Sequence, residues 1–259
     1  MRRMRASWIA GICLAITATA PAAAPQDFLA AHQQASAEAW QQFAKKHPDD
    51  ALAPLARYYA AAATAQSSSE AAIKLLRESP AKTDTPLGKL VDDSRRALLA
   101  QLLMQKLHRP LRQYYRKQVQ YPASLDELVE AKLIEPPDLL DPWGERFEYQ
   151  AKPRPTMPKV KRQTYELRCR SADVTLDQLP ETLSRLRQPV KGVVIESTSP
   201  QRNQAYAKWP RPDGTLSPSR AWSPDEPVEG LSLLMIREAF VIINDHGIPK
   251  VVPAEQPAS

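Results

Sequence analysis

The sequence predicts an α+β protein, in which an N-terminal helical segment is followed by a helix packed on an antiparallel β-sheet. Residues 27–119 carry apolar side chains at helical spacing, with cap and stop signals between the segments. Beyond residue 120 the apolar runs become short, rich in β-branched and aromatic residues, and are separated by turn signals. The change of period near residue 120 therefore predicts helices first and strands second.

The composition excludes some classes of function. The chain has 259 residues, with 25 prolines and only 7 glycines, and its glycines stand singly. A phosphate-cradling loop needs several glycines close together, so no nucleotide site of known type is expected. The net charge is +6, and it falls to +3 if Arg2, Arg3 and Arg5 are removed with a leader. Such a weak basic excess predicts no nucleic-acid partner.

Residues 1–22 are predicted to be a signal peptide. Arginines come first, an apolar run follows from Trp8 to about Ala20, and small residues such as Ala20-Pro21-Ala22 then suit signal peptidase. We expect cleavage near Ala22, a periplasmic or otherwise exported mature chain, and no membrane span after cleavage. An uncleaved anchor is the alternative. Removal of the leader also removes Cys13, which leaves Cys169 without a disulfide partner.

Residues 27–85 are predicted to form several helices. The first stops at His47-Pro48, and Asp49 or Asp50 can cap the next, which covers 51–65. A third begins at a Ser-x-x-Glu box, Ser67 to Glu70, before a linker over 80–86. The stretch from 43 to 63, FAKKHPDDALAPLARYYAAAA, resembles the junction between tetratricopeptide repeats; a plain helical hairpin is the alternative.

A longer amphipathic helix is predicted from about Leu87 to His108. Pro110 is expected to break or kink it, because a proline inside a helix removes a hydrogen bond and clashes with the preceding turn. A second short helix would follow over 110–118.

The segment from Tyr121 to Gln150 holds a helix and a turn with separate chemical causes. Ser124 and Glu127 have the spacing of a capping box at the start of a short helix. The run 141–144, Asp-Pro-Trp-Gly, has the residue preferences of a type I turn. Trp143 is large enough to bridge this turn to the core.

Strands and a helix are predicted in the second half of the chain. The expected strands are FEYQ, TYELRCR, VKGVVIES, LSLLMI and AFVIIN, and LDQLPETLSRLRQ reads as a helix. Prolines crowd residues 197–229, where we expect a long loop. Residues 230–252 should hold the C-terminal strands, with a hairpin turn at 244–247. Residues 253–259 are expected to be a disordered tail.

The residues of this segment and of the next strand form a pattern known from one family. They are Tyr121, Pro122, Leu125, Leu128, Asp141, Pro142, Trp143, Gly144, Phe147, Tyr149, Tyr165 and Asp173. In this order and spacing they resemble the periplasmic domain of the major pseudopilin of type II secretion systems. The resemblance covers roughly residues 88–175 and implies, for residues 87–196, a pilin-like helix packed on an antiparallel sheet.

The sequence departs from that family at two places. The N-terminus is an ordinary signal instead of a prepilin motif, and the helix from Leu87 carries Asp92 and Arg95. We therefore do not expect assembly into a filament by the pseudopilin route. The loop after Tyr165 offers Asp173 and Asp177 without a glycine. Calcium needs six to eight oxygen ligands on a tightly turned loop, so no calcium site is expected.

No catalytic, cofactor-binding or metal-binding residue is predicted. None of the four histidines, His32, His47, His108 and His246, has zinc-site spacing, and His47 and His108 are expected at helix ends. No Gly-x-Ser-x-Gly elbow is present. Cys169 alternates with Tyr165 and Leu167, which predicts a small core residue instead of a nucleophile.

Three functional hypotheses follow. The first is an exported, non-enzymatic envelope protein with an assembly or scaffold role, linked to type II secretion or pilus-type machinery, whose partners are other envelope proteins. The second is a periplasmic adaptor that binds peptides or proteins through its tetratricopeptide-like helices. The third is a hydrolase with an unrecognised site. The oligomeric state is left open.

Overall fold

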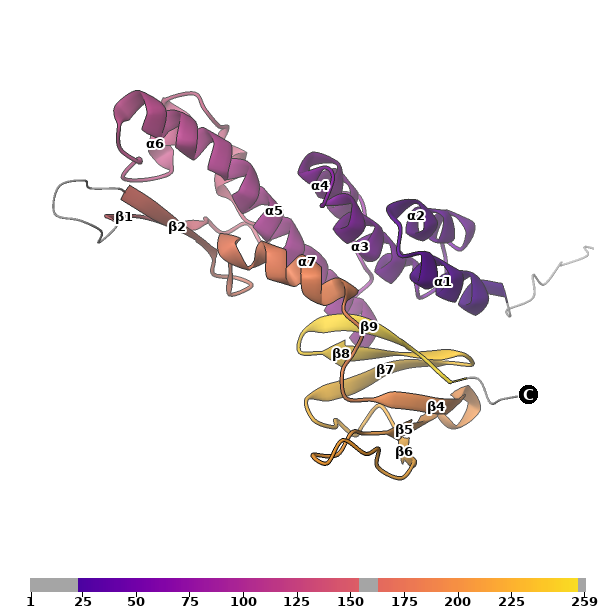
Figure 1. Ribbon diagram of the computed structural model, residues 1–259. Coiled ribbons are helices and arrows are strands. Elements are labelled where there is room, and N and C mark those ends of the chain that lie inside the picture. Colours follow the sequence, from indigo (N-terminus) through magenta and orange to yellow (C-terminus); the bar gives the residue numbers. More distant parts are fainter. Residues whose placement is uncertain (1–22, 154–162, 256–259) are drawn as a thin grey trace, which may run out of the picture.

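The computed structural model describes residues 23–153 and 163–255. The predicted signal peptide, residues 1–22, lies outside these ranges, as do residues 256–259 of the predicted tail. Within the described ranges the chain forms seven α-helices and three antiparallel sheets of three strands each, which confirms the α+β class (Figure 1).

Four short helices precede the long one. They are α1 (Ala23–Gln34), α2 (Ala37–Lys46), α3 (Ala53–Thr64) and α4 (Ser69–Arg77). The chain turns at His47, as predicted, and the Asp50 side chain accepts the N–H of Leu52 at 2.8 Å. The predicted cap Ser67 is wrong by one residue. Ser68 is the cap, because its hydroxyl accepts the N–H of Ala71 at the start of α4.

Helix α5 (Pro86–Gln118) is longer than predicted and crosses the molecule without a break (Figure 1). Of the break or kink predicted at Pro110, the break does not occur, and the short helix predicted over 110–118 is part of α5. Leu107 and Leu111 flank the proline and are fully buried, so both turns are held against the core. Burying two leucines contributes about as much as the roughly 3 kcal/mol that a helix-interior proline costs.

The first sheet lies beside the second half of α5. After α6 (Asp126–Glu130) and a 3-10 turn, η1 (Pro136–Leu139), the sheet is built from β1 (Glu148–Pro153), β2 (Gln163–Cys169) and β3 (Val174–Thr175). The capping box predicted at Ser124 is wrong: Leu125 caps α6, and no side-chain cap bond forms. The helix predicted in LDQLPETLSRLRQ is confirmed as η2 (Leu176–Gln178) and α7 (Leu179–Arg187).

The prolines at 197–229 do not make one long loop, so that prediction is wrong. The second sheet runs through this region. It consists of β4 (Val194–Ser199), β5 (Gln204–Lys208) and β6 (Arg220–Trp222), with a 3-10 turn, η3 (Pro200–Arg202), between the first two strands. The prolines fall between or after the strands, where a missing N–H removes no ladder bond. Trp209 and Trp222 pack edge to face, with ring centroids 5.8 Å apart.

The third sheet contains the C-terminal hairpin, which confirms that prediction. Its strands are β7 (Leu231–Arg237), β8 (Phe240–Asp245) and β9 (Ile248–Pro253). The two residues between β8 and β9, His246 and Gly247, both have positive φ, as a tight hairpin of matching twist requires. The tail prediction is wrong for residues 253–255: Pro253 belongs to β9, and the N–H of Glu255 bonds to the carbonyl of Ile195.

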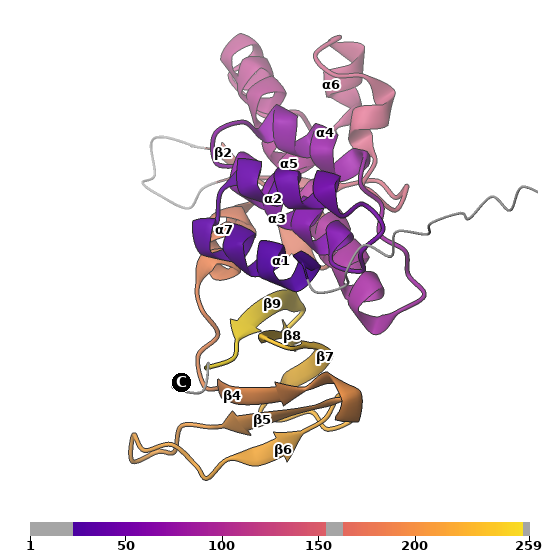
Figure 2. The ribbon, with the colours of Figure 1, turned by 90° about the vertical axis from the view of Figure 1, so that its right-hand side faces the viewer.

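The third sheet separates two hydrophobic cores. Phe240 and Ile242 of β8 face the core shared with the helices, whereas Val241 and Ile243 face the core shared with the second sheet. Strand β8 carries a continuous run of apolar residues because both of its faces are covered. Figure 2 shows the resulting order of layers: helices, then β7–β9, then β4–β6.

The N-terminal helices and the C-terminal strands share the larger core. Phe28 of α1 stacks on Phe240 with ring centroids 5.3 Å apart. The Tyr59 hydroxyl of α3 donates to the carbonyl oxygen of Pro249 at 2.7 Å. Residues 27–85 therefore do not bury their apolar faces without the strands near the C-terminus.

Candidate functional site

Asp141 organises the predicted turn. Its carboxylate oxygen Oδ1 accepts the backbone N–H groups of Trp143 at 2.8 Å and Glu145 at 3.0 Å. The other oxygen, Oδ2, accepts the hydroxyl of Ser171 at 2.6 Å and the thiol of Cys169 at 3.2 Å. The N–H of Gly144 closes the turn on the Asp141 carbonyl at 3.0 Å. The side chain thus ties the turn to the end of β2, 30 residues later in the chain.

These contacts set the ionisation of both buried groups. Burial acts to raise the pKa of Asp141, but hydrogen bonds from Ser171, Cys169 and the backbone N–H groups outweigh it, and the pKa lies below its usual value. Burial raises the pKa of Cys169 to about 11, and its hydrogen bond to Asp141 adds to the rise. The thiol is completely buried, so the structure makes Cys169 the core residue that the sequence predicts.

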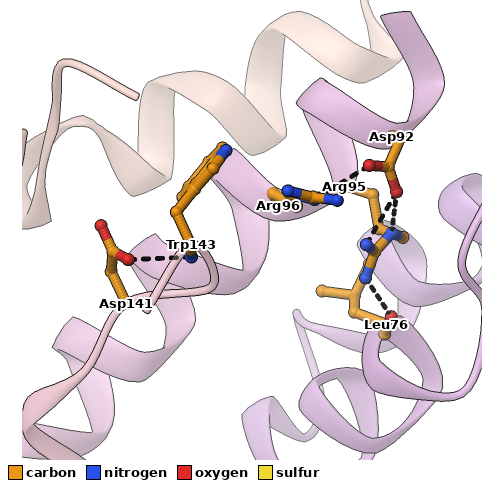
Figure 3. A network of polar contacts seen from close by, with 6 residues as sticks. All are labelled: Leu76, Asp92, Arg95, Arg96, Asp141 and Trp143. Atoms are coloured by element: carbon orange, nitrogen blue, oxygen red, sulfur yellow. Dashed lines mark hydrogen bonds and ion pairs between the residues drawn. The ribbon is translucent and has the colours of Figure 1, made fainter. Parts of the chain in front are cut away.

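Trp143 lies half-buried against the main core, next to a polar network on α5 (Figure 3). The guanidinium carbon of Arg96 is 5.8 Å from its ring centroid, within the range of a cation–π contact. Arg96 also pairs with Asp92, which in turn holds Arg95 at 2.7 Å. Arg95 donates to the carbonyl of Leu76 at 2.7 Å, which connects α5 to the end of α4.

Four tyrosines gather near the C-terminal end of α5 and form what we call the tyrosine patch. It comprises Tyr115, Tyr121, Tyr149 and Tyr165. The ring centroids of Tyr115 and Tyr121 are 4.7 Å apart, and those of Tyr121 and Tyr165 are 4.9 Å apart. All four rings are partly exposed. Three of them belong to the pseudopilin-like pattern, so the fold brings distant members of that pattern together.

A hollow of about 480 Å³ adjoins the tyrosine patch. Its lining includes Tyr121, Tyr165, His108 and the oppositely charged Arg168 and Asp177. The prediction that His108 lies at a helix end is wrong, because α5 continues past Pro110. His108 instead bonds through Nδ1 to the Tyr165 hydroxyl, and burial lowers the pKa of its imidazole.

The other residues of the pattern have structural places. Leu125, Leu128 and Phe147 are buried in the main core, and Pro122 is buried nearby. Asp173 lies apart from them on an exposed turn, where it has a positive φ and pairs with Arg168.

The other histidine predicted at a helix end, His47, does lie there. It caps the C-terminus of α2, and its Nε2 is 2.7 Å from the carboxylate of Asp27, which also pairs with Lys46. Hydrogen bonds from Lys46 and His47 lower the pKa of Asp27. These contacts give His47 a structural role.

A groove that the sequence did not predict lies between the N-terminal helices, the end of α7 and strand β9. We call it the Lys250 groove; its volume is about 440 Å³. Its lining includes Trp40 and Tyr59 from the helices, Leu186 from α7, and Val251 and Lys250 from β9. These residues are up to 211 positions apart in the chain, so no local sequence motif predicts the groove.

Lys250 is the most unusual side chain at this groove. It is only 4% exposed, and its ammonium donates to the carbonyls of Arg185 and, at 2.7 Å, Gln188, at the end of α7. No carboxylate among the described residues lies within ion-pair distance of it. Burial lowers the pKa of Lys250, and burial together with the Lys250 charge lowers that of His32 on the helix side of the groove.

Among residues 23–153 and 163–255, no cluster of three or more histidine, cysteine, aspartate or glutamate side chains is placed to hold a metal ion. None of the helices in those ranges combines the length and hydrophobicity of a bilayer-crossing segment. Comparison with models of known protein families, with curated proteins and with solved structures gave no match.

Proposed function

We propose that this chain is an exported, non-enzymatic envelope protein that acts as an assembly or scaffold component through contact with another envelope protein. A link to type II secretion or pilus-type machinery is part of the proposal and rests on the pseudopilin-like pattern. The observation that carries the contact role is the tyrosine patch.

The composition of the patch suits a protein contact. Tyrosine combines a large apolar ring with a polar hydroxyl, and it is enriched at interfaces. Three phenols in or beside the patch already have partners: Tyr149 donates to the carbonyl of Pro122 at 3.0 Å, Tyr114 donates to Glu127 at 2.5 Å, and Tyr165 bonds to Nδ1 of His108. Such bonds hold the rings in place before a partner arrives, which reduces the entropy lost on binding.

The position of the patch also supports a contact role. It lies toward the end of α5 next to α6, far along the helix from the C-terminal sheets (Figure 1). The Asp141 turn lies in the connection between α6 and β1, shortly before Tyr149 in β1, and fixes the course of the chain there. The polar groups of this turn therefore stabilise the surface that we propose as the contact site for the partner.

The adaptor hypothesis requires a different surface, on α1–α4. Those helices share a core with β8 and β9, so a fragment of residues 27–85 is not a fair test of it. Single substitutions in the full-length chain separate the two hypotheses better.

Site-specific photo-crosslinking in the envelope of the producing cell tests the proposal. A benzophenone amino acid replaces Tyr115, and the control replaces Asp213, which is exposed in the turn between β5 and β6. We expect a discrete adduct with another exported protein from position 115 and none from position 213. No adduct from position 115, or equal adducts from both positions, would refute the contact role. Sequencing of the mature N-terminus checks export, with Ala23 as the expected first residue.

A further inference from the structure

The Lys250 groove has a charge pattern that points to a ligand. Its lining contains the cationic Lys250 and Arg187 and the imidazole of His32, but no aspartate or glutamate. The other lining residues are mostly aliphatic or aromatic, among them Trp40, Leu183 and Val251. A ligand that fits these walls is apolar along its body and negatively charged at one end.

The ammonium of Lys250 has the capacity to bind that charged end. A lysine side chain has three N–H donors, and two are taken by the carbonyls of Arg185 and Gln188. The third has no partner among the described residues. A buried charge is costly unless it is paired, and the nearby Asp245 carboxylate acts on the ammonium only from beyond ion-pair distance. An anion in the groove would supply an acceptor for the third N–H of Lys250 and a negative charge in direct contact with its ammonium.

Strand β9 favours a small molecule over an added peptide strand. Backbone groups of an antiparallel strand point alternately toward its neighbour and away from it. The N–H of Ala254 bonds back toward β8, whereas the Pro249 carbonyl accepts from Tyr59 on the opposite side. Pro249, Val251 and Pro253 therefore direct their backbone groups away from β8. Two of these three residues lack an N–H, so the edge is poorly suited to pair with an extended peptide.

We propose that the Lys250 groove binds an apolar carboxylic acid, with the carboxylate on the Lys250 ammonium and the hydrocarbon body between α3, α7 and β9. The volume of about 440 Å³ lies in the range of small-molecule sites. Arg187 is exposed at the rim, where its charge attracts the anion. This site is separate from the tyrosine patch, and the inference does not depend on the scaffold role.

Isothermal titration of the full-length mature chain with decanoate, and with decanol as the uncharged comparison, tests the proposal. We expect saturable decanoate binding at one site and binding at least about tenfold weaker for decanol, since a hydrogen bond to a charged group is lost. The variant Lys250→Met should weaken decanoate by a similar factor and leave decanol unchanged. Lys191→Met removes the same charge from an exposed position outside the groove and should change neither affinity.

A second variant covers the case in which Lys250→Met fails to fold, since Lys250 also caps α7. Ala63→Phe keeps the lysine and fills the groove from a partly exposed position on α3, so decanoate binding should be lost. Equal affinities for decanoate and decanol, or unchanged decanoate binding to Ala63→Phe, would overturn the proposal. Tighter binding of an acetylated tripeptide ending in leucine would also overturn it, because the ligand would then be a peptide terminus.

Discussion

Replacement of Asp141 by alanine should destabilise the fold strongly, because its carboxylate accepts four hydrogen bonds. The hydroxyl of Ser171 and the thiol of Cys169 can rotate toward other acceptors, but the two backbone N–H groups cannot. A hydrogen bond to a charged group contributes about 1.5–3 kcal/mol, so the two N–H bonds alone account for roughly 3–6 kcal/mol. For a domain of this size that corresponds to a fall in Tm of roughly 10 °C.

Urea unfolding followed by circular dichroism measures the change in the free energy of unfolding. Asp141→Asn is the matched control. It keeps one oxygen for the two N–H groups but loses the charge and the acceptor for Ser171 and Cys169, whose hydroxyl and thiol can rotate away, so it should cost about half as much. An Asp141→Ala variant within about 0.5 kcal/mol of wild type would refute the reasoning.

The pH dependence gives a second check on Asp141. Its pKa is lower in the folded chain than in the unfolded chain. The stabilisation by the carboxylate is therefore fully present above about pH 4 and is lost as the pH falls through the folded-state pKa. The difference in unfolding free energy between wild type and Asp141→Asn should shrink below about pH 4. A difference that stays constant down to pH 2 would contradict the assignment.

Three further predictions concern other buried positions. Arg95→Met should cost about 3–5 kcal/mol in urea unfolding, because it removes the buried hydrogen bonds to Asp92 and to the Leu76 carbonyl and leaves the buried Asp92 carboxylate with only the more exposed Arg96 as a partner. Arg96→Met should cost under about 1 kcal/mol, and equal effects of the two substitutions would count against the network. Pro110→Ala should stabilise by about 1–3 kcal/mol, because it restores a helix N–H, and a destabilised variant would show that the proline is needed. Alkylation of Cys169 by iodoacetamide at pH 8 should be about a hundredfold slower in native protein than in urea, because the raised pKa of about 11 for the Cys169 thiol suppresses the thiolate. Similar rates in both conditions would place the thiol in solvent.

Features set by residues close together in the chain could be predicted from the sequence. The turn at 141–144 depends on an aspartate side chain and a glycine three positions apart, and the structure forms it with the expected hydrogen bonds. The hairpin at His246 and Gly247 is similar: Asn244 accepts the N–H of Gly247 at 2.7 Å, as a local turn signal implies.

Features set by packing between distant segments could not be predicted. Pro110 signals a helix break by local chemistry, but Leu107 and Leu111 are buried on either side, and that burial decides the outcome. Residues 197–229 look like a loop by proline count. Trp209 and Trp222 pack against the third sheet, and the sequence of 197–229 does not reveal that contact.

The two proposed binding regions differ in the same way. The tyrosine patch could be predicted in part, since Tyr121, Tyr149 and Tyr165 belong to a pattern with family-like spacing. The Lys250 groove could not, because a lysine between a proline and a valine reads as an ordinary exposed strand residue. Only the fold brings the end of α7 over Lys250 and buries its ammonium.

The central claim, that the tyrosine patch contacts an envelope protein, is tested most directly by an affinity measurement. Once crosslinking has identified that protein, its dissociation constant is measured against the wild-type chain, Tyr115→Ala and the control Asp213→Ala. Truncation of a hot-spot tyrosine costs about 2 kcal/mol or more, so we expect binding at least about tenfold weaker for Tyr115→Ala and unchanged for Asp213→Ala. Unchanged affinity for Tyr115→Ala would contradict the account.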